Sequence, residues 1–171
     1  MYTIFINMKL HTLPLLWVVV FTSCSTGKSE SSSKNAIQEY GIVSKQDINL
    51  ADCLSQIEEK YLIFFYSETC GHCKEIIEDV TLFAESNIIK TYFLNISKNE
   101  NKIERCSHDE IEVGVDRVEE LKIVGTPSIV EVEKGVTTAN VVGKDSCLAF
   151  LNEQKDKYII AYAGFSLVIY C

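Results

Sequence analysis

Residues 64–74 read Phe-Phe-Tyr-Ser-Glu-Thr-Cys-Gly-His-Cys-Lys, and the rest of the chain is organised around this stretch. The apolar run 61–66 has the length and composition of a strand that is buried on both faces. After a short polar step, apolar residues recur at helical spacing, at Cys73, Ile76, Ile77, Val80 and Phe83. The sequence therefore predicts a strand, a turn and a helix that begins near Cys70, with Thr69 as the N-cap.

Two cysteines at this junction predict redox chemistry. The thiolate is the reactive form of cysteine, and a helix N-terminus favours it through free amides and a partial positive charge. We expect Cys70 to be the exposed nucleophile and Cys73 to lie under it, close enough to form a disulfide. A protonated His72 between them would stabilise the thiolate further. The C-x-x-C spacing thus favours a redox pair over two unrelated core cysteines.

The tetrapeptide Cys70-Gly71-His72-Cys73 resembles the active site of protein disulfide isomerase domains, in the thioredoxin superfamily. A second mark of that family lies downstream, in the run Val124-Gly125-Thr126-Pro127-Ser128 and the alternating strand after it. The resemblance covers roughly residues 40–157. It implies an α/β thioredoxin fold, in which a central mixed β-sheet is flanked by helices.

The same resemblance implies a thiol–disulfide oxidoreductase with Cys70 and Cys73 as its catalytic residues. It implies a cis peptide bond before Pro127, which packs beside the disulfide, shapes the substrate groove and keeps metals off the dithiol. The backbone at Thr126 would pair with an extended substrate chain, and Gly71 and His72 would support the site. No cofactor is needed beyond the dithiol, and the expected substrates are protein thiols and disulfides.

One position departs from the family pattern. Many family members carry a buried carboxylate six residues before the first cysteine, as a proton relay to the second, whereas this chain has Phe64 there. Glu68 is closer in sequence but lies beyond the strand. We therefore expect proton transfer from Cys73 to be slow or mediated by water.

The remaining pattern completes a thioredoxin-like order of elements. The expected elements are a weak edge strand at 40–48, a helix at 50–60, strands at 61–66 and 88–96, an active-site helix to about 86, a polar insertion or extra helix at 99–112, a short helix at 115–121, a hairpin of strands ending at 133 and spanning 136–142, and a last helix at 145–155.

The start of the chain predicts export. Residues 1–23 carry no acid and one base, Lys9, followed by a short apolar core, as in a signal peptide; Met8 is an alternative initiator. The run 20–24 resembles the lipobox of bacterial lipoproteins, in which Cys24 is lipidated, and ordinary cleavage nearby is the alternative. We expect an extracytoplasmic protein anchored at a bacterial membrane, on its periplasmic or cell-surface side, with a membrane redox partner.

Two further segments flank the domain expected at 40–157. Residues 24–39 form a tether, because 25–35 hold five serines and almost nothing apolar. Residues 158–171 form an apolar tail without any charge, of unknown role. Docking on the domain is the least demanding interpretation, and contact with the membrane or an altered gene end are the alternatives.

Composition limits the classes of ligand and the states of the cysteines. The chain has 16 basic and 24 acidic residues and no basic run, which argues against binding to nucleic acid. Acids gather between residues 100 and 120, most simply as a solvated face. Among the seven cysteines, we expect Cys53 and Cys147 to be buried free thiols. The pairing of Cys53, Cys106, Cys147 and Cys171 stays open.

Two other functional classes remain. Cys70, Cys73, Cys106 and His108 have spacings that would suit a tetrahedral zinc site. A thioredoxin-fold binding protein without catalysis is the second, and the intact C-x-x-C argues against it. The direction of electron flow also stays open, although a histidine between the cysteines favours an oxidase or isomerase over a strong reductase.

Overall fold

A computed structural model of the chain describes residues 46–168, with side chains up to residue 161. The predicted signal segment, Cys24, the tether and most of the expected strand at 40–48 lie outside these residues. Of that strand, residues 46–48 are described, and they pair in parallel with the edge of the sheet through an Asp47–Phe93 bridge.

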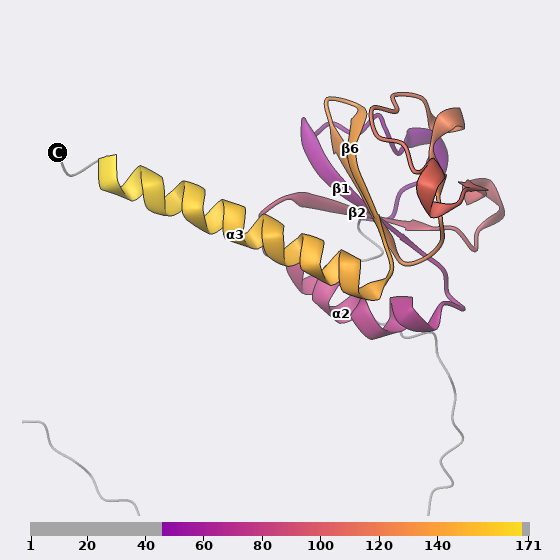
Figure 1. Ribbon diagram of the computed structural model, residues 1–171, viewed down its shortest axis with the longest axis horizontal. Helices are drawn as coiled ribbons and strands as arrows, with labels where there is room; N and C mark the ends of the chain where they lie inside the picture. Colours follow the sequence, from indigo (N-terminus) through magenta and orange to yellow (C-terminus); the bar gives the residue numbers. More distant parts are fainter. Residues whose placement is uncertain (1–45, 169–171) are drawn as a thin grey trace, which may run out of the picture. The chain divides into compact units, whose positions relative to one another are not determined.

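Four strands form the central sheet in the order β2-β1-β5-β6 (Figure 1). Strands β1 (Lys60–Tyr66) and β2 (Lys90–Asn95) are parallel, whereas β5 (Ser128–Glu133) and β6 (Val136–Val142) run antiparallel to their neighbours. The Lys134-Gly135 turn of the β5–β6 hairpin has positive φ at both residues, as the sequence predicts for a tight turn. The predicted mixed sheet is therefore present.

Two helices pack on one face of this sheet. Helix α2 (Gly71–Glu85) and helix α3 (Lys144–Val168) contact each other and share one core cluster with β1. The central members of that cluster are buried aromatic, aliphatic and sulfur side chains, namely Phe64, Cys73, Ile77, Val80, Phe83, Phe93, Cys147 and Leu151. The helical periodicity that predicts α2 is thus its buried face.

The other face of the sheet is covered differently. Within the described residues, short 3-10 helices, loops and a two-stranded sheet lie over it, and no α-helix does. The small sheet pairs β3 (Glu104–Arg105) with β4 (Lys122–Ile123) in parallel, and the 3-10 helices are η2 (Leu50–Asp52), η3 (Asn99–Asn101), η4 (His108–Glu110) and η5 (Val118–Glu120).

The helix predicted over 50–60 is wrong. Only one 3-10 turn, η2, forms there. Ser55 Oγ and Gln56 Nε2 both donate to the carbonyl oxygen of Asp52, and these side-chain bonds compete with the backbone hydrogen bond that this carbonyl would accept in an α-helix. The hydroxyl of Tyr61 donates to the carbonyl of Cys53 and fixes the chain in this irregular path. Ile57, which has helical spacing with Leu50 and Leu54 and would share a buried face with them in a helix, is 94% exposed.

The short helix predicted over 115–121 is also wrong, apart from η5 at its end. The backbone of Val115 hydrogen-bonds to Thr137 of β6 instead of forming a helix. Its amide donates to Thr137 Oγ1, and its carbonyl oxygen accepts from the Thr137 amide. The polar insertion at 99–112 forms two 3-10 turns, η3 and η4, and one strand, β3.

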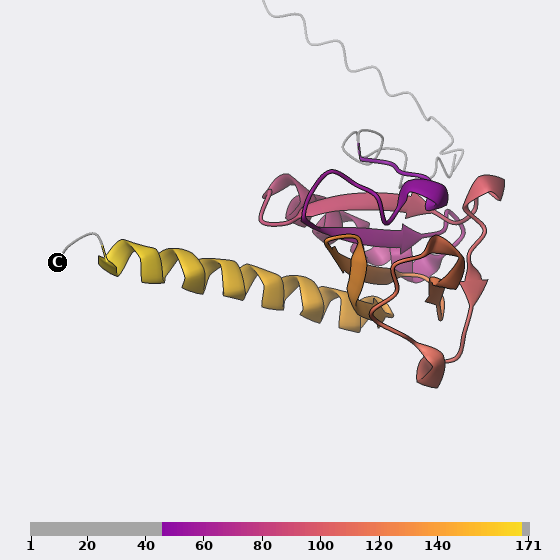
Figure 2. The same ribbon diagram turned by 90° about the horizontal axis from the view of Figure 1, so that it is seen from above.

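The last helix is longer than predicted. Instead of ending near 155, α3 continues to Val168, so the apolar tail extends the helix and runs beyond the strands of the sheet (Figure 2). Ile159 and Ile160 are 62% and 71% exposed, so docking on the domain does not occur at these two residues. Among the described residues, no helix combines the length and apolar character needed to cross a bilayer.

Candidate active site

Cys70 and Cys73 lie where β1 passes into α2 and are joined in a disulfide, with their Cα atoms 5.3 Å apart. A turn brings the chain from strand to helix, in which the amide of Cys70 donates to the carbonyl of Ser67. Cys70 itself is the N-cap of α2, and the prediction of Thr69 in that role is wrong. The Thr69 hydroxyl instead bonds to Ser67 Oγ, at 3.1 Å.

The backbone at the helix start is directed at the Cys70 sulfur. The amide of Cys73 donates to Cys70 Sγ at 3.1 Å, in the place where a capping oxygen would otherwise stand. This bond and the partial positive charge of the helix N-terminus both favour a thiolate at Cys70. Cys70 is half-buried, whereas Cys73 is fully buried, so only Cys70 is open to attack from solvent.

The loop before β5 lies directly against this sulfur. The Thr126–Pro127 bond is cis, as the resemblance implies, and the carbonyl oxygen of Thr126 lies 3.3 Å from Cys70 Sγ. The loop is held from the other side, because the carbonyl of Pro127 accepts from the amide of Gly143 at 2.9 Å. Ser128 Oγ also donates to the carbonyl of Gly125. The disulfide and the cis-proline loop thus form one site from segments more than 50 residues apart.

His72 points to a partner that the sequence did not suggest. Its side chain is 69% exposed, and its Nδ1 lies 3.5 Å from Glu75 Oε1, one helical turn further along α2. The second oxygen of Glu75 accepts from Lys144 Nζ, at 2.7 Å. Lys144 holds the pKa of the Glu75 carboxyl below its usual value, and His72 lowers it further. Gly71 is exposed, and a Cβ there would meet no atom within 4 Å.

No carboxylate replaces the missing relay beneath Cys73, as far as the described residues go. Phe64 is fully buried in the same cluster as Cys73, between the rings of Tyr66 and Phe93 with centroid distances of 6.0 and 5.9 Å. Glu68 faces elsewhere, since its Oε1 accepts from Asn95 Nδ2 at 2.9 Å. The surroundings of Cys73 are apolar, as the sequence predicts from Phe64.

The remaining described cysteines are free thiols. Cys53 and Cys147 are buried as predicted, and burial raises the pKa of each to about 12. Cys147 Sγ lies 3.7 Å from the carbonyl of Pro127, so this thiol packs under the cis-proline loop. Cys106 is half-buried in the polar insertion. Cys171 lies outside the described residues.

The predicted zinc ligands do not come together. Within residues 46–161, no three His, Cys, Asp or Glu side chains form a group that could hold a metal ion. Cys106 and His108 therefore do not join Cys70 and Cys73 in a common site.

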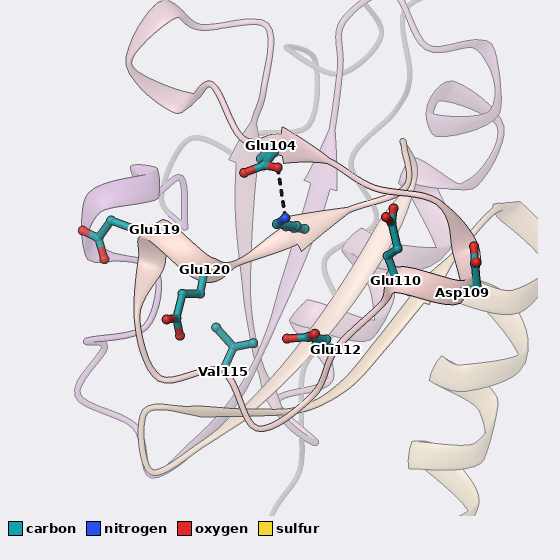
Figure 3. A pocket seen from close by; sticks show the side chains of 8 residues that line it. Glu104, Asp109, Glu110, Glu112, Val115, Glu119 and Glu120 are labelled. Carbon is teal, nitrogen blue, oxygen red and sulfur yellow. Dashed lines mark ion pairs between the residues drawn. The ribbon is translucent and has the colours of Figure 1, made fainter.

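Six of the acids between residues 100 and 120 line an open hollow of about 640 Å³ (Figure 3). Its wall also holds one lysine, Lys122, which pairs with Glu104 at 3.0 Å. The open, carboxylate-lined wall agrees with the solvated acidic face expected from the sequence.

The strand order β2-β1-β5-β6, the disulfide at the start of α2 and the cis-proline loop confirm the predicted thioredoxin-type fold. A model of the family described as TraF, F plasmid transfer operon protein, matches residues 25–145. Mitochondrial thioredoxin 3 from Saccharomyces cerevisiae, in its oxidized form, is 16% identical, with 68% of this chain and 97% of that chain covered and a TM-score of 0.47. Thioredoxin f2 from Chlamydomonas reinhardtii is also 16% identical, with 63% and 93% covered and a TM-score of 0.43. No curated protein matches the chain.

Proposed function

Because the chain belongs to the TraF family, and because its fold carries a C-x-x-C disulfide beside a cis-proline loop, we propose that it exchanges disulfides with exported proteins outside the cytoplasm. The thioredoxin-like fold and the C-x-x-C pair support thiol–disulfide oxidoreductase activity in general. The protein-disulfide-isomerase type of site, the location and the membrane partner are parts of the proposal.

The observation that carries the proposal is the difference between the two sulfurs. Cys70 is half-buried, and its Sγ accepts a hydrogen bond from the Cys73 amide and lies 3.3 Å from the Thr126 carbonyl oxygen, whereas Cys73 is fully buried in the core. A partly accessible sulfur stabilised as a thiolate and a buried sulfur one turn away are the arrangement that directional disulfide exchange needs.

In the oxidising direction, a substrate thiolate attacks Cys70 Sγ and the Cys70–Cys73 bond breaks. Cys73 leaves as a thiolate and takes up a proton, which leaves a mixed disulfide between Cys70 and the substrate. A second substrate thiolate then attacks the substrate sulfur of that bond, and Cys70 leaves as the thiolate that the helix start stabilises. Two electrons pass from the substrate pair to the dithiol. The reverse sequence reduces a substrate disulfide.

The cis-proline loop supports binding of the substrate chain. Thr126 lies two residues before β5, with its carbonyl oxygen 3.3 Å from Cys70 Sγ, where an extended peptide would form backbone hydrogen bonds as an added strand. Pro127 shapes this groove.

The anchoring part of the proposal rests on the sequence before residue 46. A lipid on Cys24 and the tether 24–39 would hold the domain at the membrane surface while letting it reach clients. Such a protein needs a membrane redox partner, which restores the dithiol or the disulfide after each turnover.

The reduction potential of the Cys70–Cys73 pair, measured on the purified full chain equilibrated against glutathione, tests the function and gives its direction. A value of about −120 to −180 mV indicates an oxidase or isomerase, and about −270 mV indicates a reductase. A Cys73→Ser variant should accumulate mixed disulfides with exported proteins, and a Cys70→Ser variant should accumulate none. Failure of the pair to form a disulfide at any poise would overturn the proposal.

A further inference from the structure

Three ionisable side chains, His72, Glu75 and Lys144, lie in a row at the starts of the two α-helices. Glu75 stands at the centre of this row on α2, with one oxygen 3.5 Å from His72 Nδ1 and the other 2.7 Å from Lys144 Nζ. Lys144 is the first residue of α3, and 69 positions separate it from Glu75. The carboxylate therefore connects two elements that the sequence keeps far apart.

The ion pair is linked to the Cys70 site through the backbone at the starts of both helices. Gly143 donates its amide to the carbonyl of Pro127, and Lys144 follows directly after it. On the other side, Glu75 lies two residues after Cys73, in the turn of α2 that follows the disulfide. Both partners of the pair thus belong to the backbone segments that surround Cys70.

The charged groups of this row act on the Cys70 thiol in opposite directions. Lys144, a protonated His72 and the N-terminus of α2 favour a thiolate, whereas the Glu75 carboxylate opposes it. Lys144 is unfavourably placed with respect to the dipole of its own helix, and Glu75 compensates for this. Asp145, the next residue of α3, also acts on the Lys144 charge.

We propose that Glu75 and Lys144 are positioning residues that set the acidity of the Cys70 thiol: the Glu75 carboxylate makes the thiol less acidic, and the Lys144 cation offsets the Glu75 charge. This inference rests on the proposed function, since thiol acidity matters here only for disulfide exchange. Glu75 also orients the imidazole of His72 through Nδ1, so the ring is held toward the helix surface.

The two single variants separate this role from a structural one. Glu75→Gln and Lys144→Met each break the same ion pair, so a purely structural role changes both variants in the same direction. An electrostatic role changes them in opposite directions: Glu75→Gln lowers the pKa of the Cys70 thiol, and Lys144→Met raises it. The pair is exposed to solvent, so we expect about a twofold to threefold change in the thiolate fraction in each case.

The experiment titrates Cys70 in the reduced full chain, by its rate of alkylation with iodoacetamide between pH 5 and 10, followed residue by residue by mass spectrometry. The double variant should titrate within error of the wild type, and 1 M salt should shrink the difference between the single variants. Glu153→Gln and Lys157→Met are the controls, because they break another exposed ion pair, with a distance of 2.9 Å, whose two partners both lie on α3.

The inference is overturned if both single variants shift the pKa of Cys70 in the same direction, or if neither shifts it relative to the controls. The proposed function fails in a different way, through a wild-type chain that exchanges no disulfide although its Cys70 titrates normally. Because the titration needs no substrate, the two failures are distinguishable.

Discussion

Replacing Glu68 with glutamine tests whether the site works without a carboxylate relay. Glu68 is the acid nearest in sequence before Cys70, and the position where the family places a buried acid holds Phe64. In the structure the Glu68 carboxylate accepts from Asn95 Nδ2 at 2.9 Å, while Cys73 lies in an apolar cluster. Glu68 is therefore part of the turn and has no contact with the buried sulfur.

The expected effects follow from these contacts. Glutamine keeps an oxygen that accepts from Asn95, so the variant should lose less than about 1 kcal/mol of unfolding free energy. Removing a partly exposed charge near Cys70 lowers the thiol pKa slightly, but a less basic thiolate is also a weaker nucleophile, so the exchange rate should stay within about threefold. A carboxylate that moved the proton of Cys73 would contribute about 10²–10⁴-fold.

The assay is stopped-flow exchange of the full chain with glutathione disulfide at pH 7, with Glu78→Gln on the exposed side of α2 as the control. Glu68→Gln and its control should be indistinguishable within threefold. A loss of more than about a hundredfold in Glu68→Gln alone would refute the reasoning, because it would show that Glu68 acts as the relay in solution.

Two further predictions concern buried side chains. Phe64→Ala should lower the free energy of unfolding, measured in urea, by about 3–5 kcal/mol, because it leaves a cavity beside the rings of Tyr66 and Phe93. The control Leu82→Ala, at a residue that is 56% exposed, should lower it by less than about 1 kcal/mol. Equal losses in the two variants would contradict the burial of Phe64. Burial raises the pKa of the Cys147 thiol to about 12, so at pH 8 roughly one molecule in 10⁴ carries the thiolate. Iodoacetamide should therefore label Cys147 at least a hundredfold more slowly than the half-buried Cys106, and urea should remove this difference. Mass spectrometry of the native chain measures both rates, and similar labelling of the two thiols would show that Cys147 is accessible.

The sequence predicts those parts of the fold in which local pattern and burial agree. The apolar run 61–66 and the spacing from Cys73 to Phe83 give β1 and α2 because each pattern has the period of the element that it forms. The Thr126-Pro127 motif likewise predicts the loop that reaches Cys70. In these segments the apolar residues at the periodic positions are all buried in the core.

The failure at residues 115–121 arises because a distant partner decides the local structure. These residues have the pattern of a short helix, yet Thr137 hydrogen-bonds both backbone groups of Val115, 22 positions away. The cap prediction for α2 fails for a different reason: the helix start is capped by the Cys70 sulfur, a local group that cap preferences for hydroxyls and carboxylates do not include.

In the candidate site, too, some residues could be predicted from local sequence and others could not. The cysteines and the proline were found from their spacing, whereas Glu75 was missed, although its position three residues after His72 on a helix is a detectable signal. Its pairing with Lys144 has no such signal, because the contact depends on how α3 leaves the sheet after Gly143. Long-range ion pairs are set by the completed fold.

The groups that touch the reactive sulfur are backbone groups, and this limits what the neighbouring side chains can do. The Cys73 amide and the Thr126 carbonyl contact Cys70 Sγ whatever side chains surround them, because the helix start and the cis-proline loop place them there. The basic exchange chemistry therefore requires little from the charged residues nearby. What remains for those residues is adjustment of the thiol's acidity, and among the described charges the Glu75–Lys144 pair is the one that joins both backbone segments around that sulfur.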